Sequence, residues 1–327
     1  MSHEIKKICG EKNRYQAMIP SELYNQPVNL SKAVIQSLHD ELLNERQLII
    51  DVLRLDCIHP VISGNKWFKL KYHLQQVIQQ NKKGIVTFGG AWSNHLVATA
   101  FACRQAGIPC IGIIRGEQPA TPSATLLDAQ QYNMQLQFVS REAYSNEAEI
   151  VQSLQITYPD HLIVPQGGQS DYGVRGAAEI LQLTHAKSYS HLACATGTGT
   201  MLAGLVRAGL PHQQVIGVCS LKIPSNDNNS INSFVLPYAA GLKNYTIFYD
   251  YHFGGYARKT NELIQFMNAM YEKHQLPTDF VYTGKLLFGI MDRVKTGYFK
   301  NGSRILIVHS GGLQGNRSLP AGTLTFL

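Results

Sequence analysis

Long apolar runs are absent from this sequence. No stretch of about 18 consecutive apolar residues occurs, so we expect no membrane-spanning helix and no membrane partner. Residues 1–14 are polar and lack the apolar core of a secretion signal. Linkers rich in Gly, Ser or Pro, internal repeats and low-complexity tracts are also missing. With 44% hydrophobic and 16% charged residues in a chain of 327, the composition indicates a globular, cytoplasmic protein of one large or two moderate domains.

Clustered positive charge and paired cysteines are absent too. The net charge is +7, but the longest basic runs are the pairs Lys6-Lys7 and Lys82-Lys83. A nucleic-acid binder would concentrate its basic residues, so we expect no such partner. An anionic cofactor or substrate would suit the sign, although a spread surface charge explains it equally well. Because no CxxC pair occurs, we expect reduced, buried thiols at all six cysteines. These are Cys9, Cys57, Cys103, Cys110, Cys194 and Cys219.

Strand-like and helix-like segments alternate along most of the chain. Short apolar runs predict strands, and apolar residues at helical spacing predict helices. The predicted strands are 84–90, 110–114, 136–139, 161–165, 191–195, 215–220, 279–282 and 304–309. The predicted helices are 94–106, 126–132, 142–155, 174–183, 201–208, 260–273 and 286–296.

This alternation predicts an α/β fold with two open, twisted, mostly parallel sheets flanked by helices. We expect residues 67–165 to form a small domain. Residues 1–66 and 166–327 would form a large, cofactor-binding domain. Ligands of such sheets bind beyond the carboxyl ends of the strands, so the active site is expected in the cleft between the domains.

Three polar, Gly-rich turns follow predicted strands. In residues 89–95, which open a helix, free N–H groups and the helix dipole would hold a carboxylate or phenolate oxygen. Ordinary helix capping by Ser93 or Asn94 is the alternative. Residues 195–200 (Ala-Thr-Gly-Thr-Gly-Thr) have the composition of a phosphate cradle, but lack GK[ST] and a proper GxGxxG. Residues 309–312 (His-Ser-Gly-Gly) form a similar turn, or only a flexible one.

A candidate reactive amine follows Gly64. Lys66 lies at the start of a helical pattern, where a cation is disfavoured and the lysine pKa is depressed. A neutral amine is what Schiff-base chemistry requires. A solvated surface lysine is the alternative, and we expect that state for Lys69 and Lys71.

Four segments together resemble one enzyme family. Residues 63–70 (Ser-Gly-Asn-Lys-Trp-Phe-Lys-Leu) are similar to G-N-K-x-x-K-L, and residues 89–95 to G-G-x-x-S-N-H. Residues 282–285 (Tyr-Thr-Gly-Lys), followed by Gly289, resemble Y-[ET]-G-K, and residues 309–312 resemble H-[LT]-G-G. They occur in the right order over most of the chain. The sequence therefore resembles the 1-aminocyclopropane-1-carboxylate deaminase and D-cysteine desulfhydrase family of pyridoxal-phosphate enzymes.

The resemblance implies a tryptophan-synthase-β-like fold (pyridoxal-phosphate fold type II), pyridoxal 5′-phosphate as cofactor, no metal, a small amino-acid substrate and a homodimer. Lys66 would hold the cofactor as a Schiff base, and Asn94 would bond the phenolate oxygen of its ring. Tyr282 would lie at the substrate, and Tyr256 matches a second family tyrosine. The turn with Ser93, Asn94 and His95 would bind the substrate, as would Ser310.

The resemblance assigns the phosphate to the Gly/Thr turn. Its predicted ligands are Thr196, Gly197, Thr198, Gly199 and Thr200. Met201 departs from the pattern, because a threonine is common there before x-A-G. Thr198 or Thr200 would then supply the missing hydroxyl.

Two positions bear on the reaction. Ring-opening deaminases carry Glu after the tyrosine and Leu after the histidine, whereas this chain has Thr283 and Ser310. The resemblance places the residue after the tyrosine near the pyridine nitrogen of the cofactor, so Thr283 would be a cofactor-binding residue. A carboxylate at this position would keep the nitrogen protonated and strengthen the electron sink, which a threonine does less well. Loss of a thiolate from Cβ needs a weaker sink than ring opening. We therefore expect β-elimination from D-cysteine to pyruvate, sulfide and ammonia.

In this reaction Lys66 or Tyr282 would remove the Cα proton. N–H groups of residues 93–95 would bind the substrate carboxylate, or His95 would be a surface residue without a role. The rivals are ring-opening deamination, a racemase, a dehydratase or another elimination of D-amino acids. An inactive binding relative and a nucleotide-binding enzyme are further alternatives. The intact Lys66 argues against the first of these two, and the missing GK[ST] against the second.

Overall fold

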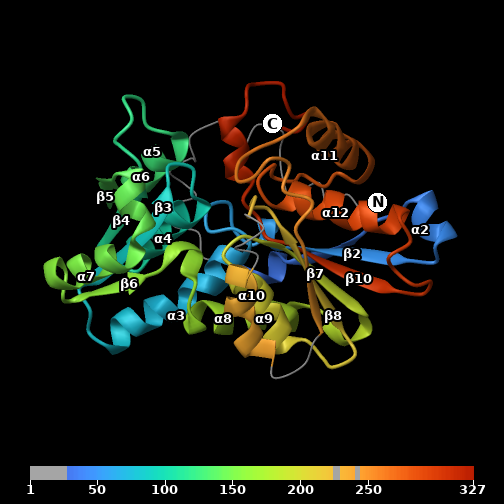
Figure 1. Cartoon of the computed structure of the whole chain (residues 1–327), viewed down its shortest axis with the longest axis horizontal. Coiled ribbons are helices and arrows are strands. Elements are labelled where there is room, and N and C mark those ends of the chain that lie inside the picture. The colour runs from blue at the N-terminus through green and yellow to red at the C-terminus, as the bar shows by residue number, and fades with distance from the viewer. Residues whose placement is uncertain (1–27, 224–228, 240–243) are drawn as a thin grey trace.

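The computed structural model describes residues 28–223, 229–239 and 244–327. The described part of the chain contains two separate sheets, and helices cover both faces of each (Figure 1). All strand pairs are parallel except β1 and β2, at one edge of the larger sheet, which are antiparallel. The predicted α/β fold with two mostly parallel sheets is thereby confirmed.

The larger sheet has six strands in the order β1-β2-β10-β7-β8-β9. Its central strands are buried on both faces, and every residue of β7, β8 and β10 after the first is buried. Helices α11 and α12 lie over one face, and α8 and α9 lie over the other (Figure 1). The strands are β1 Val34–Ser37, β2 Ile49–Arg54, β7 His191–Thr196, β8 Gln214–Cys219, β9 Tyr245–Phe248 and β10 Arg304–His309.

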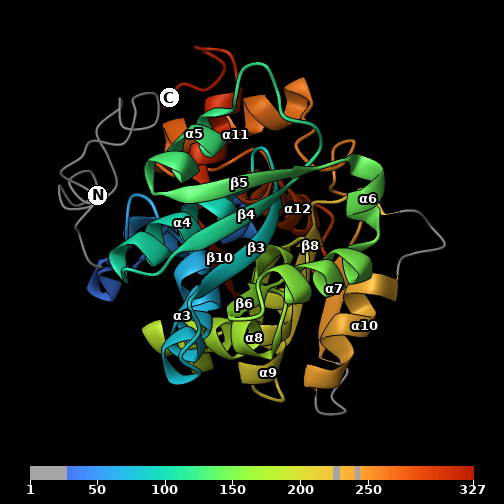
Figure 2. The same cartoon turned by 90° about the vertical axis from the view of Figure 1, so that its left-hand side faces the viewer.

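The smaller sheet has four parallel strands in the order β5-β4-β3-β6, seen face-on in Figure 2. The two faces of β4 follow the two-residue period of a strand: Cys110 and Ile114 join one apolar cluster, Ile111 and Ile113 the other. Helices α4 and α5 supply the first cluster, and α6 and α7 supply the second. The strands are β3 Gly84–Gly90, β4 Cys110–Arg115, β5 Met134–Val139 and β6 His161–Val164.

Helix α3 (Asn65–Gln79) joins the two halves. Phe68 packs into the core of the larger sheet, while Leu70 and Val77 pack into that of the smaller one. At Gly176 of α8, an added Cβ would come within 1.7 Å of the Phe68 carbonyl oxygen, so only glycine permits this close approach. The predicted boundary between residues 66 and 67 thus falls within a helix that packs on both halves.

The other helices have these bounds: α2 Glu41–Glu45, α4 Asn94–Gln105, α5 Ala124–Gln131, α6 Arg141–Ser145, α7 Glu147–Thr157, α8 Asp171–Ala178, α9 Thr200–Ala208, α10 Asn229–Val235, α11 Asn261–His274 and α12 Thr283–Lys295. Short 3-10 helices include η4 Gln166–Gly168 and η8 Leu313–Ser318. No helix among the described residues is both long and apolar enough to cross a membrane.

Several local predictions were wrong. Residues 279–282 form no strand, because the Asp279 carboxylate accepts hydrogen bonds from the N–H groups of Val281 and Tyr282 and so makes a turn before α12. The helix predicted at 142–155 is two helices that meet at Asn146. Strands β1, β2 and β9 were not predicted.

The cysteine prediction holds for four residues. Cys103, Cys110, Cys194 and Cys219 are free and buried. Cys57 departs from it, being disulfide-bonded. Cys9 lies outside the described residues.

Candidate active site

A cavity of about 280 Å³ opens where strands of both sheets end. The smaller sheet contributes Gly90, Arg115 and the Gln166-Gly167 turn, and the larger sheet contributes Ala195, Leu221 and the turn at Ser310. The remaining lining residues come from the starts of α3 and α4, from the Gly/Thr turn, from two tyrosines and from the two glycines after Ser310. They are Asn65, Lys66, Lys69, Ser93, Asn94, His95, Gly197, Thr198, Tyr256, Tyr282, Gly311 and Gly312.

Lys66 occupies the first turn of α3, as predicted. Gly64 precedes this turn with φ +66°, and a Cβ there would lie 1.8 Å from the Ser310 carbonyl oxygen. Only glycine therefore lets the chain enter α3 directly against the Ser310 turn. The Lys66 Nζ donates a hydrogen bond of 2.8 Å to Asn65 Oδ1. Burial lowers the pKa of Lys66 to about 8, although the charge of Asp279 opposes the shift. Much of the amine is therefore neutral near pH 8.

Lys69 is not the solvated surface residue that we predicted. Its side chain is only 6% exposed and lines the cavity one helical turn after Lys66. Burial, together with the nearby charge of Lys66, lowers the pKa of Lys69 to about 7. Lys71, in contrast, is partly exposed and forms an ion pair with Glu179. A buried cation at Lys69 marks a place where an anion would be stabilised.

The turn at Ser93 presents its polar groups to the cavity. Ser93 is the N-cap residue of α4, but its hydroxyl makes no capping hydrogen bond, so capping does not account for it. Asn94 Nδ2 donates to the Gly312 carbonyl at 3.4 Å, while the buried Asn94 Oδ1 has no hydrogen-bond partner. Buried polar atoms are seldom left unpaired, so the orphan oxygen indicates that a bound group completes this turn.

His95 is buried, not a surface residue. Thr87 Oγ1 donates to the Val164 carbonyl at 2.9 Å, so it must accept the proton of His95 Nε2, also at 2.9 Å. His95 Nδ1 is then an acceptor, and it has no partner. Burial lowers the pKa of His95 well below 6.5, and the charges of Lys66 and Lys69 add to this. The ring is therefore neutral and offers no proton at Nδ1.

Only part of the Gly/Thr turn faces the cavity. Gly197 and Thr198 line it, and a Cβ on Gly197 would lie 3.3 Å from the Tyr282 ring. Gly199, with φ +86°, is the N-cap residue of α9. As in any α-helix, the first N–H groups of α9 have no intrahelical partners. Thr196 and Thr200 are fully buried, and Thr200 Oγ1 pairs with Thr198 Oγ1 at 3.0 Å. Thr196 and Thr200 do not line the cavity.

Tyr256 and Tyr282 lie together on the far wall. Their rings meet edge to face with centroids 6.2 Å apart. Burial raises the pKa of both, that of Tyr282 well above 10.

Thr283 is bound to a buried carboxylate behind the cavity. Its hydroxyl donates to Asp279 Oδ1 at 2.7 Å and accepts the Asp279 N–H at 2.7 Å. Asp279 also accepts the N–H groups of Val281, Tyr282 and Thr283 at 2.8–2.9 Å. The hydroxyl proton of Thr283 is thus already used within the protein, and Thr283 does not line the cavity.

The turn after β10 is held by a buried network. His309 Nε2 lies 2.8 Å from the Pro277 carbonyl, and its Nδ1 lies 3.0 Å from Asp56 Oδ1. Arg54 donates to both carboxylate oxygens of Asp56. These contacts tie the ends of β2 and β10 to the loop before α12, and so place Ser310, Gly311 and Gly312 at the cavity.

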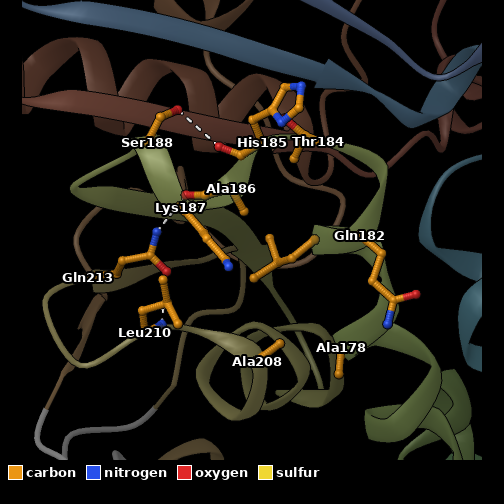
Figure 3. A pocket seen from close by; sticks show the side chains of 11 residues that line it. Ala178, Gln182, Thr184, His185, Ala186, Lys187, Ser188, Ala208, Leu210 and Gln213 are labelled. Atoms are coloured by element: carbon orange, nitrogen blue, oxygen red, sulfur yellow. Dashed lines mark hydrogen bonds between the residues drawn. The ribbon is translucent and has the colours of Figure 1, made fainter.

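A second hollow of about 630 Å³ lies by α8 and α9, away from these residues (Figure 3). Gln213 uses its whole amide there: Nε2 donates to the carbonyls of Ala186 and Tyr189, and Oε1 accepts the Leu210 N–H. Ser188 likewise donates to the His185 carbonyl. The buried polar groups of this hollow are already paired, so it offers no comparable chemistry.

The chain belongs to the family of pyridoxal-phosphate-dependent enzymes, whose model matches residues 46–311. It is 29% identical to a putative 1-aminocyclopropane-1-carboxylate deaminase of Pyrococcus furiosus, covering 81% of this chain and 85% of that protein. It is 25% identical to a D-cysteine desulfhydrase of Klebsiella pneumoniae, covering 80% and 86%. A crystal structure of a homologue of 1-aminocyclopropane-1-carboxylate deaminase superposes with a TM-score of 0.74 at 25% identity, covering 90% and 94%. The predicted family and cofactor, pyridoxal 5′-phosphate, are thereby confirmed.

The cavity fits this cofactor. The orphan Asn94 Oδ1 marks an incomplete polar site, the Lys69 side chain offers a buried cation, and Gly197 leaves room beside Tyr282. Sequence reasoning missed Asn65, Lys69, Arg115, Gln166 and Asp279. The Pro165-Gln-Gly-Gly168 turn after a strand was a usable signal for Gln166. Nothing local marked Arg115 or Asp279.

Proposed function

We propose that this protein is a pyridoxal-phosphate-dependent lyase that converts D-cysteine and water to pyruvate, sulfide and ammonia. One observation carries the choice of reaction: no Asp or Glu occurs among the described residues that line the cavity, which instead has Lys66, Lys69 and Arg115. The buried carboxylate of Asp279, whose charge acts on Lys66, accepts the Thr283 hydroxyl proton and three backbone N–H groups. Such a site suits a reaction with a good leaving group.

The chain's own residues would hold the cofactor as follows. Lys66 would bind it covalently, and the second N–H of Asn94 Nδ2 would donate to its ring oxygen. Its phosphate would lie between Lys69 and the N–H groups at the start of α9, where Gly197 and Thr198 form the cavity wall. Thr283 would lie behind the ring nitrogen. When bound, the cofactor withdraws electron density from the substrate and so stabilises negative charge at Cα.

Proton transfer would be divided between Lys66 and the two tyrosines. The lowered pKa of Lys66 makes it the better base at neutral pH, whereas burial raises the pKa of Tyr282 and keeps its hydroxyl protonated. Tyr282 is therefore suited to donate a proton to the departing sulfur, and Tyr256 orients it through the edge-to-face packing of the two rings.

Ser93, Ser310 and the N–H groups at the start of α4 would bind the substrate carboxylate. The His95 side chain cannot do so, because its Nδ1 is an acceptor. His95 would instead contribute through its place in the first turn of α4.

Ring opening of 1-aminocyclopropane-1-carboxylate is the second candidate, supported by the 29% identity to a putative deaminase. A D-amino-acid racemase, a dehydratase or another elimination would use the same groups. An inactive binding protein would have no need of Lys66 with its lowered pKa.

The proposal is tested by colour and by product. We expect purified protein with pyridoxal phosphate to be yellow, to bleach with borohydride and to release sulfide and pyruvate from D-cysteine. The Lys66→Ala variant should be colourless, whereas Lys187→Ala, at the exposed second hollow, should match wild type. Release of 2-oxobutanoate from the cyclopropane amino acid, with no sulfide from D-cysteine, would replace the elimination by ring opening.

We also propose a homodimer in the cytoplasm, with residues 67–165 forming a small domain that closes the cavity against the rest. Sedimentation at several protein concentrations would test the dimer. Substrate-dependent change in small-angle scattering would test the closure.

A further inference from the structure

The residue that departs from the phosphate-turn pattern has an unexpected partner. Met201, in the first turn of α9, is only 3% exposed. Its Sδ accepts a hydrogen bond of 3.0 Å from Nδ2 of Asn65. The other end of the same amide, Asn65 Oδ1, accepts the 2.8 Å hydrogen bond from Lys66 Nζ. One buried side chain therefore links Met201 to the candidate cofactor lysine.

The chemistry of the sulfur decides which way the Asn65 amide points. A thioether has no proton and can only accept, so the NH₂ end of the amide must face Met201. The carbonyl end must then face Lys66. A neutral lysine amine has two N–H groups and one lone pair. Donating a proton to Oδ1 leaves that lone pair free for the cavity, where it is needed to attack a carbonyl carbon.

Without the sulfur, the opposite orientation becomes available. If the amide turned over, Nδ2 would donate to the Lys66 lone pair, which would stabilise the neutral amine but block it as a nucleophile. Met201 is only 3% exposed and does not line the cavity, so water cannot substitute freely for its sulfur. A leucine at position 201 would still pack against the apolar cluster of Met201, which includes Phe68 and Leu202. Packing alone therefore does not require sulfur.

We propose that Met201 is a positioning residue for Lys66. Its thioether holds the Asn65 amide in the one orientation that leaves the lysine lone pair free. The catalytic consequence rests on the proposed role of Lys66, but the geometric statement concerns the protein without cofactor.

Competitive labelling of the cofactor-free protein with acetic anhydride tests the proposal. The rate at each lysine is followed against pH by peptide mass spectrometry, which reports both the pKa and the reactivity of the neutral amine. In Met201→Leu we expect the pKa of Lys66 to fall and its limiting reactivity to drop roughly fivefold, the effect of one ordinary hydrogen bond. Exposed Lys187 and buried Lys285, which donates to the carbonyls of His252 and Gly255, should not change.

The Asn65→Ala background separates this mechanism from packing. There the amide is gone, so adding Met201→Leu should leave the Lys66 curve unchanged. An effect of Met201→Leu that persists in Asn65→Ala would overturn the proposal, and so would identical curves for Met201→Leu and wild type. Because no cofactor is present, failure of the proposed reaction would leave this result intact. If the Lys66 curve of Met201→Leu matches that of wild type while Lys66 does bind the cofactor, only the proposed role of Met201 is refuted.

Discussion

At the scale of single residues, burial is the main cause of the chemistry at this site. It lowers the pKa of Lys66 from 10.5 to about 8 and that of Lys69 to about 7. The sequence suggested a lowered pKa of Lys66 through the helix dipole, whereas the structure shows burial of the amine as its cause. The opposing charge of Asp279 keeps the pKa of Lys66 from falling further.

The shifted pKa predicts how the protein captures its cofactor. If Lys66 binds the cofactor as proposed, only its neutral amine can attack the aldehyde, so the capture rate should rise with pH and level off above about 8. Stopped-flow absorbance of cofactor-free protein mixed with pyridoxal phosphate measures this rate. Acetyl-lysine amide in solution, the control, should keep accelerating to about pH 10. A protein profile that follows the free amine would contradict the shift.

Asp279 is the residue whose loss should cost most stability near the site. Asp279→Asn removes the charge that accepts three backbone N–H groups and the Thr283 hydroxyl. We expect a loss of roughly 2–4 kcal/mol in urea unfolding, because the orphaned donors stay buried. The same change should lower the pKa of Lys66, since the charge of Asp279 raises it. The control Asp250→Asn, at a side chain 78% exposed, should leave the urea midpoint unchanged. Equal midpoints for both variants would refute the role of Asp279.

At the scale of elements, the site depends on how α3 begins. The helix starts directly against the Ser310 turn because Gly64 has no side chain. Lys66 and Lys69 then lie one turn apart and face the same cavity, as residues at i and i+3 on a helix do.

Two glycines with nearly the same φ test this entry, although Gly64 also has ψ −141°, a conformation that residues other than glycine rarely adopt. Gly64 and Gly107 have φ values of +66° and +67°, but an added Cβ meets Ser310 at 1.8 Å in the first case and nothing within 4 Å in the second. Gly107→Ala should cost about 1–2 kcal/mol, the cost of a left-handed alanine. Gly64→Ala should lose more stability and most cofactor binding. Thermal unfolding and cofactor titration compare them, and equal losses would mean that the contact with Ser310 is unimportant.

At the scale of the whole molecule, an ion pair joins the two halves. Asp128 on α5 of the smaller sheet binds Arg317 on η8, which follows β10 of the larger sheet. Both side chains are largely buried, with 3% and 12% exposed. Removing one partner of such a pair leaves an uncompensated charge.

Breaking this pair should loosen the attachment of the smaller sheet. Asp128→Asn should destabilise the protein by about 1–3 kcal/mol in urea and speed proteolysis between the halves. Adding Arg317→Met should recover part of the loss, because no unpaired charge then remains. The exposed pair Lys83–Asp160 serves as control, and Asp160→Asn should have no measurable effect. If Asp128→Asn behaves like Asp160→Asn, the two halves are held by apolar packing alone.

The sequence by itself determined the fold class and most of the site. Apolar runs separated by helical patterns predicted the buried parallel strands β3, β7, β8 and β10, because such strands need continuous apolar residues. Short motifs, each readable from a few consecutive residues, predicted the site residues Lys66, Ser93, Asn94 and Tyr282. These residues line one cavity, as the position of ligands beyond parallel strands requires.

Tertiary structure alone decided the rest. Lys69 was predicted to be a surface lysine, but α3 packs between the two halves and so buries it. Residues 279–282 were predicted to form a strand, but hydrogen bonds from the backbone to the Asp279 side chain override strand propensity there. The link from Met201 through Asn65 to Lys66 joins α9 to the start of α3. Met201 and Asn65 are 136 residues apart in the sequence. No local pattern encodes such contacts, because burial and pairing depend on which distant segments the fold brings together.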